Sequence, residues 1–265
     1  MNAMQPLLLL RAREVVRTWR VWVLPAVLVF LATTGPVITR FTKEILAGAL
    51  GNGEAGAILL TDPTAADAAG RWITDISQLA VFVVVLMAAG AINSEVRSGV
   101  ASLMLVKPAS RTAYVVSHAI VLVLFVAVSA LIGAVASWAV TRLLWGDGES
   151  STSVGGLGTM LGATGMWIVL AAVLITASLL ASVAFDALAA AAGIGIGTFF
   201  LLILAGTMPR LAEYTPAGLI PTSSAIATGA PVDDAAMWWP VITGVILAAV
   251  LLASAVLVFR RKELR

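Results

Sequence analysis

The sequence is poor in the residues that carry most protein chemistry. It has no cysteine, which excludes disulfides and thiolate metal sites. Its one histidine, His118, argues against a histidine metal cluster or a Ser-His-Asp centre. None of its three lysines, Lys43, Lys107 and Lys262, follows a glycine, so the phosphate-binding motif G-x-x-x-x-G-K-[ST] does not occur. We therefore expect no enzymatic activity, no directly bound cofactor and no metal site.

Charge is scarce as well. Charged residues make up 11% of the chain and hydrophobic residues 60%, whereas soluble domains carry roughly 25% charged residues. A soluble fold of 265 residues could not cover its surface with so few charges, but lipid solvates apolar side chains. The net charge of +2 gives no support for nucleic-acid binding. The composition therefore predicts an integral membrane protein.

Six stretches are long and apolar enough to cross a bilayer, which takes roughly 20 residues. They are residues 21–38, 73–92, 114–140, 157–185, 187–208 and 235–259. Asp186 alone separates the fourth from the fifth, and we expect it at the tip of a hairpin because a carboxylate is costly at the bilayer centre. The prediction is an all-α membrane domain, 21–259, with six transmembrane helices and a basic tail, 260–265.

Basic residues are distributed unevenly between the two sides that six alternating spans create. One side holds both termini and these basic residues: Arg11, Arg13, Arg17, Arg20, Arg97, Lys107, Arg111, Arg260, Arg261, Lys262 and Arg265. The other side holds only Arg40, Lys43, Arg71, Arg142 and Arg210. Because Lys and Arg concentrate in cytoplasmic segments, we predict a multi-pass protein of the plasma membrane with cytoplasmic N- and C-termini.

Three further segments carry structural predictions. Residues 1–20 read as a cytoplasmic amphipathic helix on the membrane surface, because apolar positions recur at helical spacing and arginines line another face; a simple basic tail is the alternative. Residues 39–70 read as a long outer loop. Residues 209–234 read either as an irregular loop or as a short helix dipping into the outer leaflet.

Small and aromatic residues suggest how the helices pack. Gly158/Gly162 and Gly193/Gly197 have the small-xxx-small spacing that lets helix backbones approach closely, which favours packing inside the bundle; a flexible moving element is the alternative. Tryptophans, among them Trp72, fall near span ends and read as interfacial anchors. No charge lies deep inside any predicted span, apart from Asp186 at its turn. This favours an apolar or amphipathic cargo over ions.

The loop between the second and third spans, residues 93–113, mixes charges with apolar side chains. Apolar side chains at a surface need a partner or the membrane edge to cover them. Pro108 ends one helix, and Ser110 is placed to cap the next by accepting a backbone N–H. We predict a short helix, a proline turn and a capped long helix, which together form a lever.

The residues of this loop and the topology together resemble a known family. The pattern is Glu95-x-Arg97-Ser98-Gly99, then Leu103 and Leu105, then Lys107-Pro108-x-Ser110-Arg111-x-x-Tyr114. It is similar to the signature loop of the permease (transmembrane) subunit of bacterial type-2 ABC exporters. Two positions depart from the family: Val100 stands where threonine is frequent, and His118 stands near a frequent lysine or arginine.

The resemblance implies a function for the loop. In that family it is the coupling helix that docks on a cytoplasmic ABC ATPase, which binds ATP and magnesium. By position the contact residues here would be Glu95, Arg97, Ser98, Gly99, Leu103, Leu105, Pro108, Ser110 and Arg111. The permease would pair with a second copy or a paralogue, would lie among membrane lipids, and would export a lipid, drug, peptide antibiotic or polymer.

Other interpretations stay open on the sequence alone. Glu95 and Arg97 could be solvated boundary charges, and His118 reads as an interhelical residue or, less simply, as a proton relay. The chain could be a secondary transporter or channel without an ATPase partner. A membrane-embedded enzyme would need paired acids or a nucleophile with a base at membrane depth. A structural or regulatory subunit could share the topology.

Overall fold

The structure is a computed structural model that describes residues 8–13, 20–50, 62–97, 110–150 and 156–262. Its described elements are helical, and six of them are long and apolar enough to cross a membrane. This confirms the predicted all-α architecture with six transmembrane helices. The six candidate spans are Val21–Ile45, Ala65–Arg97, Arg111–Gly146, Leu157–Ala184, Leu188–Gly206 and Met237–Arg261.

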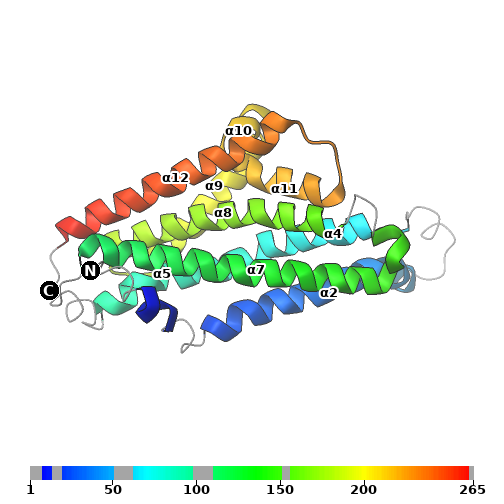
Figure 1. Cartoon of the computed structure of the whole chain (residues 1–265), viewed down its shortest axis with the longest axis horizontal. Coiled ribbons are helices and arrows are strands. Elements are labelled where there is room, and N and C mark those ends of the chain that lie inside the picture. Colours follow the sequence, from blue (N-terminus) through cyan, green and yellow to red (C-terminus); the bar gives the residue numbers. More distant parts are fainter. Residues whose placement is uncertain (1–7, 14–19, 51–61, 98–109, 151–155, 263–265) are drawn as a thin grey trace.

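The long helices run along one axis with alternating direction (Figure 1). In chain order they are α2 (Arg20–Leu50), α4 (Ala65–Asp75) continued by η1 (Ile76–Ala80) and α5 (Val81–Arg97), α7 (Arg111–Ser150), α8 (Leu157–Ala184), α9 (Leu188–Gly206) and α12 (Asp234–Arg261). Consequently α2 begins, and α5 and α12 end, at the same end of the bundle. We call it the basic end, because it carries Arg97, Arg111, Arg260, Arg261 and Lys262.

Helix α8 lies at the centre of the bundle and is the most buried of the six spans. It packs against α12, α5, α7, α11 and α9. The residues that α8 contributes to the core include Trp167, Leu170 and Leu174, each almost fully buried. The other spans are lipid-facing on part of their surface, as the large exposed apolar side chains along α7, α9 and α12 indicate.

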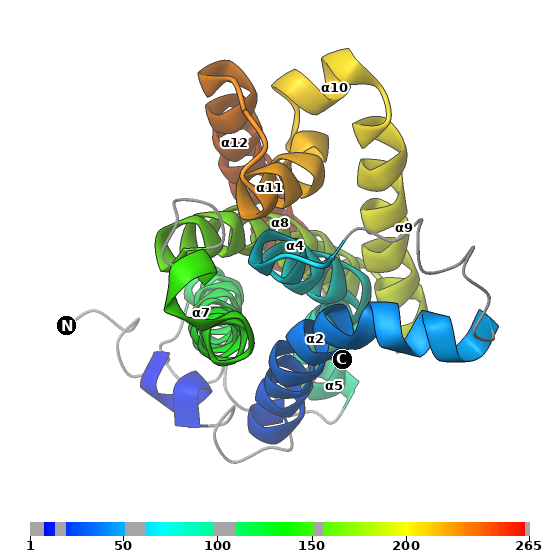
Figure 2. The ribbon, with the colours of Figure 1, turned by 90° about the vertical axis from the view of Figure 1, so that its right-hand side faces the viewer.

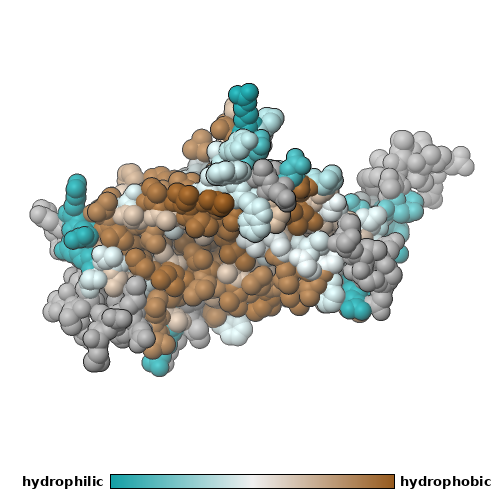
Figure 3. Space-filling view, turned by 45° about the horizontal axis from the view of Figure 1, so that its top comes forward, coloured by the Kyte–Doolittle hydropathy of each residue, from teal (hydrophilic) through white to brown (hydrophobic). Residues whose placement is uncertain are grey.

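The surface reflects this arrangement. In the face shown in Figure 3, a broad apolar band occupies the middle of the molecule, and polar residues gather toward its ends and on a projection at its top. Exposed apolar residues such as Leu124, Ile132, Leu201 and Val250 would be costly in water. Lipid covers such a band, so the protein is a multi-pass membrane protein.

The second span is longer than the sequence predicted. It begins with α4, whose Thr64 forms a capping box with Asp67, and it passes through the π-helix η1 before α5. Asp75, the third residue of the predicted span 73–92, is 5% exposed inside this helix, and its Oδ1 lies 2.8 Å from Nε of Arg71. A partner four residues away on the same helix makes this burial tolerable.

The first predicted outer loop is partly wrong. Residues 39–50 continue α2 as helix, and α4 already begins at Ala65. No proline or paired glycine interrupts the sequence between Val37 and Leu50, so nothing in it stops the helix. The N-terminal segment is helical at residues 8–13, and residues 14–19 lie outside the described part.

The segment between α9 and α12 contains helix rather than only irregular loop. It forms α10 (Pro209–Tyr214), the 3-10 turn η2 (Pro216–Gly218) and α11 (Leu219–Thr228). Gly218 is required here, because a Cβ at this residue would lie 1.9 Å from the carbonyl oxygen of Ala212. The position of these helices relative to a membrane surface stays a prediction.

Two predictions on small and aromatic residues are wrong within this chain. A Cβ on Gly158, Gly162, Gly193 or Gly197 would meet nothing within 4 Å. The close approach occurs instead at Gly195, where a Cβ would lie 2.3 Å from Ser178 Oγ and 2.6 Å from Val85 Cγ1. Trp72 is not an interfacial anchor, since it is fully buried and donates to Thr164 Oγ1 at 3.1 Å.

Candidate functional site

A buried polar cluster closes the basic end of the bundle around Glu95. Helix α5 continues past the predicted end of the span at residue 92 and places Glu95 on its last turn, 6% exposed. The hydroxyl of Tyr114 donates to Glu95 Oε2 at 2.5 Å, and His118 Nε2 lies 3.6 Å from Oε1. Because Tyr114 and His118 lie on α7, this carboxylate ties the end of α5 to the first turns of α7.

Arg11 reaches the same carboxylate from the N-terminal segment. Its two terminal nitrogens donate one to each carboxylate oxygen of Glu95, with Nη2 at 2.7 Å from Oε2. The guanidinium also lies over the ring of Tyr114, 5.0 Å from its centroid, in a cation–π contact. Arg11 is 2% exposed. A buried, bidentate ion pair of this kind is strong and geometrically specific. It therefore anchors the helix of residues 8–13 to α5 and α7.

Helix α12 joins the cluster through an aromatic stack. The rings of Tyr114 and Phe259 are nearly parallel, 5.2 Å apart between centroids, and Phe259 is fully buried. The ring of His118 meets that of Tyr114 in a T-shaped contact, with 5.1 Å between the centroids. We refer to Arg11, Glu95, Tyr114, His118 and Phe259 as the Glu95 cluster.

A second set of contacts binds the end of α12 to its neighbours. Nη1 of Arg111, on the first turn of α7, donates to the carbonyl oxygens of Arg260 at 3.0 Å and Lys262 at 2.8 Å, and more weakly to that of Phe259 at 3.4 Å. Carbonyls in the last turn of a helix have no partner within it. One side chain of α7 therefore caps α12, and we call these contacts the α12 clasp.

Lys262 extends the α12 clasp to the turn between α8 and α9. Its ammonium donates to Val183 O at 2.9 Å and to Asp186 Oδ1 at 2.7 Å. The hydrogen bond and charge of Lys262, with the more distant charge of Arg97, hold the pKa of the exposed Asp186 carboxyl below its usual value. Asp186 lies at the turn between α8 and α9, as the sequence predicted.

Comparisons with known proteins bear on residues 63–265. This part of the chain matches the family model described as "Protein of unknown function (DUF2705)". The chain belongs to this family. Across 219 residues it is also 25% identical to the "Uncharacterized transmembrane protein YxlG" of Bacillus subtilis (strain 168), covering 81% of this chain and 82% of that protein.

The DUF2705 match includes most of the Glu95 cluster. Glu95, Tyr114, His118 and Phe259 lie inside the matched residues, whereas Arg11 lies outside them. The match also includes Arg111, Lys262 and Asp186 of the α12 clasp. The N-terminal helix is therefore joined to a DUF2705 core whose own residues supply the carboxylate and the aromatic stack.

Four of the nine loop residues singled out in this DUF2705 chain are described. Glu95 is buried and paired, which contradicts its reading as a solvated boundary charge, whereas Arg97 is exposed. The Ser110 hydroxyl accepts the Ala113 amide at 3.1 Å, which confirms the predicted cap of α7, and Arg111 forms the α12 clasp. The other five lie outside the described residues: Ser98, Gly99, Leu103, Leu105 and Pro108.

Several residues of the site were not singled out from the sequence. Arg11 and Lys262 were counted only as basic residues of one side, and Phe259 only as the end of a span. One signal was available: a carboxylate next to an apolar helix of the DUF2705 core needs a cationic partner. The sequence indicates that Glu95 needs a cationic partner. The partner, Arg11, lies 84 positions away in the chain, so only the fold identifies it.

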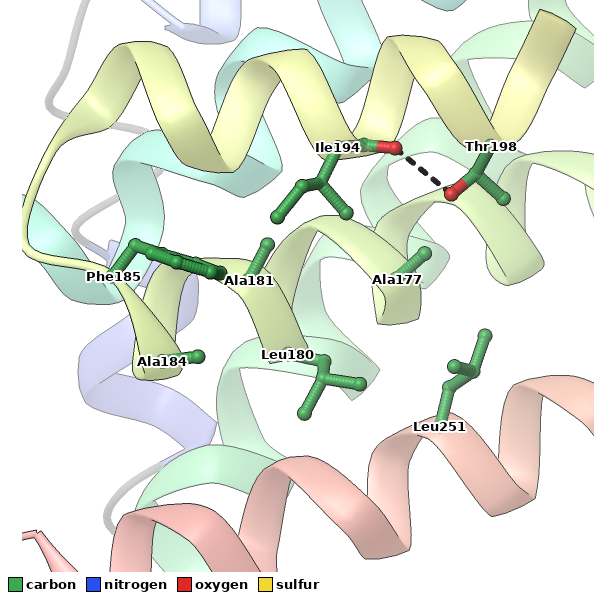
Figure 4. Close-up of a pocket in the computed structure, with 8 residues that line it drawn as sticks. All are labelled: Ala177, Leu180, Ala181, Ala184, Phe185, Ile194, Thr198 and Leu251. Carbon is green, nitrogen blue, oxygen red and sulfur yellow. Dashed lines mark hydrogen bonds between the residues drawn. The ribbon is translucent and has the colours of Figure 1, made fainter. Parts of the chain in front are cut away.

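An apolar pocket lies next to the α8–α9 turn, between α8, α9 and α12 (Figure 4). Its volume is about 350 Å³, and it is lined by Ala177, Leu180, Ala181, Ala184, Phe185, Ile194, Thr198 and Leu251. The only hydroxyl in this lining, on Thr198, already donates to Ile194 O at 2.8 Å. The pocket therefore offers an apolar surface with no free hydrogen-bond donor, which suits a hydrocarbon chain.

Proposed function

We propose that this protein is the transmembrane permease subunit of an ATP-driven exporter of the ABC-2 type, energised by a separate ATPase. The observation that carries the proposal is the anchoring of the two helix ends that flank the segment resembling a coupling loop. Helix α5 ends at Arg97 and α7 begins at Arg111, both at the basic end, and the Glu95 cluster and the α12 clasp connect these ends to their neighbours. A partner that pushes on the loop pushes on anchored helices rather than on a loose connection.

The route of the force follows from the contacts. Glu95 joins the end of α5 to Tyr114 on α7, and Arg111 joins α7 to the end of α12. Lys262 then reaches the end of α8 at Val183 O and the α8–α9 turn at Asp186. Four of the six spans are thereby connected within one layer at the basic end. A connected layer allows the spans to change together between two states, as alternating access requires.

The orientation belongs to the same proposal. We place the basic end, with both termini, in the cytoplasm and the protein in the plasma membrane. The excess of Lys and Arg on this side supports the orientation. The ATPase, with its ATP and magnesium, would then meet the loop of residues 98–109 in the compartment where nucleotide is found.

The proposed cargo class rests on the buried charges and on the pocket. In the described part of the spans, the two buried carboxylates, Asp75 and Glu95, are each paired with an arginine. The pocket of Figure 4 offers an apolar lining. We propose an apolar or amphipathic cargo, moved by two paired permeases, which are copies of one chain or paralogues.

The test starts from isolation of the chain in its native complex. We expect an ATPase with a phosphate-binding loop to co-purify in fixed stoichiometry, and its ATP hydrolysis to be vanadate-sensitive in reconstituted vesicles. The charge reversal Arg97→Glu, at an exposed residue on the flank of the loop, should reduce co-purification and coupled hydrolysis several-fold.

The matched control is Arg210→Glu. Arg210 is an exposed arginine on α10, at the end of the bundle opposite the basic end. It should leave ATPase binding unchanged. If Arg97→Glu and Arg210→Glu behave alike, the loop does not receive the ATPase. If transport by the purified chain runs on an ion gradient without any nucleotide, the protein is a secondary transporter and the proposal is wrong.

A further inference from the structure

Helix α2 is longer than a bilayer needs. Its 31 residues correspond to about 46 Å, whereas the hydrocarbon core is roughly 30 Å thick. Proline 36 lies inside it and is buried. A proline removes one helical hydrogen bond and its ring pushes against the preceding turn, which bends the helix. In Figure 2, which looks along the bundle, the part of α2 toward Leu50 turns aside and extends sideways beyond the other helices.

The bent part is amphipathic in an unusual direction. The residues Val37, Ile38, Phe41 and Ile45 recur at helical spacing, and each is 40% to 60% exposed. On the opposite side, Thr39 and Lys43 are only half-exposed. A helix on a water-soluble protein turns its apolar side to the core. Here the apolar side faces away from the protein, so the surroundings must cover it.

The polar side is attached to the segment before α4 and to the end of α7. Lys43 pairs with Asp62 at 2.7 Å. The guanidinium of Arg40 lies over the ring of Trp145, 5.7 Å from its centroid, and Trp145 donates to Pro63 O at 2.9 Å. Arginine and tryptophan side chains at one level are typical of the boundary between hydrocarbon and water. These contacts fix which side of the helix faces the membrane.

We propose that residues 37–48 form an in-plane helix, embedded in the membrane surface at the end opposite the basic end. Lipid acyl chains cover Val37, Ile38, Phe41 and Ile45, while Thr39 and Lys43 face the headgroups. The covering partner is lipid because the apolar side continues the apolar surface of the spans, and the attached polar side leaves only the outward direction open. The inference stands on α2 alone and does not depend on the proposed function.

The chain has no cysteine, so in a single-cysteine variant the label attaches only at the introduced residue. We would attach a nitroxide to Thr39→Cys, Phe41→Cys, Lys43→Cys and Ile45→Cys in vesicles of phosphatidylethanolamine and phosphatidylglycerol. The depth of each label follows from its collision rates with oxygen and with a water-soluble nickel complex. Ile132→Cys, on an exposed part of α7, and Asp67→Cys, on an exposed residue of α4, are the references.

An in-plane helix gives an alternating result. Labels at Phe41 and Ile45 should be deeper than labels at Thr39 and Lys43, with an oxygen-to-nickel ratio several-fold higher. A helix that simply continues the span gives depths that change steadily, by about 1.5 Å per residue, so position 41 would lie between 39 and 43. That steady series would overturn the proposal.

Two other results would also overturn it. If the labels at Phe41 and Ile45 are shielded from both reagents and show spin–spin broadening, a second copy of this chain covers the apolar side. If the nickel complex reaches both labels freely, water does. A label that changes the elution profile of the purified protein is replaced by one at Val37, which lies on the same side of the helix.

Discussion

Glu95 receives contacts from three side chains that belong to two other segments of the chain. Arg11 donates to both of its oxygens, and Tyr114 donates to one of them. Removing one member of a buried ion pair leaves an uncompensated charge, which costs about 3–5 kcal/mol, whereas replacing both members by apolar residues is often neutral. A loss of stability is therefore expected when one partner of the pair is removed, and not when both are replaced by apolar residues.

The first prediction follows from this asymmetry. Glu95→Ala should lower the free energy of unfolding by about 3–5 kcal/mol, and the double variant Arg11→Met/Glu95→Leu should recover most of that loss. The measurement is an SDS titration of the purified protein. Arg97→Ala, on the same turn but exposed, is the control and should cost within about 0.5 kcal/mol. Equal effects of Glu95→Ala and Arg97→Ala would show that the cluster does not stabilise the fold.

At the residue scale, the sequence predicted where polar residues lie along the helices better than it predicted which residues they contact. It placed Glu95 and Arg111 next to the ends of spans, and Ser110 at a cap, because these depend on local rules of helix ends. It did not identify Arg11 or Phe259, because hydrogen bonds and ring stacks between distant residues have no local pattern. The same reason explains why Gly195, and not Gly193 or Gly197, makes the close helix contact.

At the scale of elements, helix existence was predictable and helix length was not. Hydrophobic stretches identify the lipid-crossing core of each span, and all six are present. Residues beyond 38 extend α2 and residues beyond 92 extend α5, and both extensions mix polar with apolar side chains. Ion pairs such as Lys43–Asp62 and Arg11–Glu95 stabilise these extensions, and hydropathy does not detect them.

The second prediction concerns the α12 clasp and its pH dependence. Because the pKa of Asp186 is lowered when the chain is folded, the contact with Lys262 is fully formed above the ordinary aspartate pKa, about 3.9. It is lost as the pH falls through the lowered value. Amide protection at the end of α12, measured by hydrogen exchange and corrected for the intrinsic rate, should therefore stay constant at neutral pH and fall only in acid.

Two variants check the cause. Lys262→Met should show reduced protection at every pH and no acid transition, because the partner of Asp186 is gone. Arg260→Met removes a neighbouring exposed charge without touching the Lys262 side-chain bonds and should behave like the original chain. An acid transition that persists in Lys262→Met would assign the pH dependence to another group.

At the scale of the whole molecule, the helices alternate in direction, so the turn at Asp186 lies at the basic end and Asp67 at the other. The third prediction is that Asp67→Cys reacts with a membrane-impermeant maleimide on intact cells, whereas Asp186→Cys reacts only after the cells are opened. Both side chains are exposed, so accessibility to the reagent reports the side of the membrane. The reverse pattern would invert the proposed orientation.

Arg111 holds carbonyl oxygens at three positions in the last turn of α12 with one nitrogen. A rotation of α7 about its own axis would sweep that nitrogen sideways and pull on the carbonyls together. The final turn of α12 must then follow or unwind. A rotation at the start of the third span would therefore move the end of α12, so a label near the carboxyl terminus would report this motion.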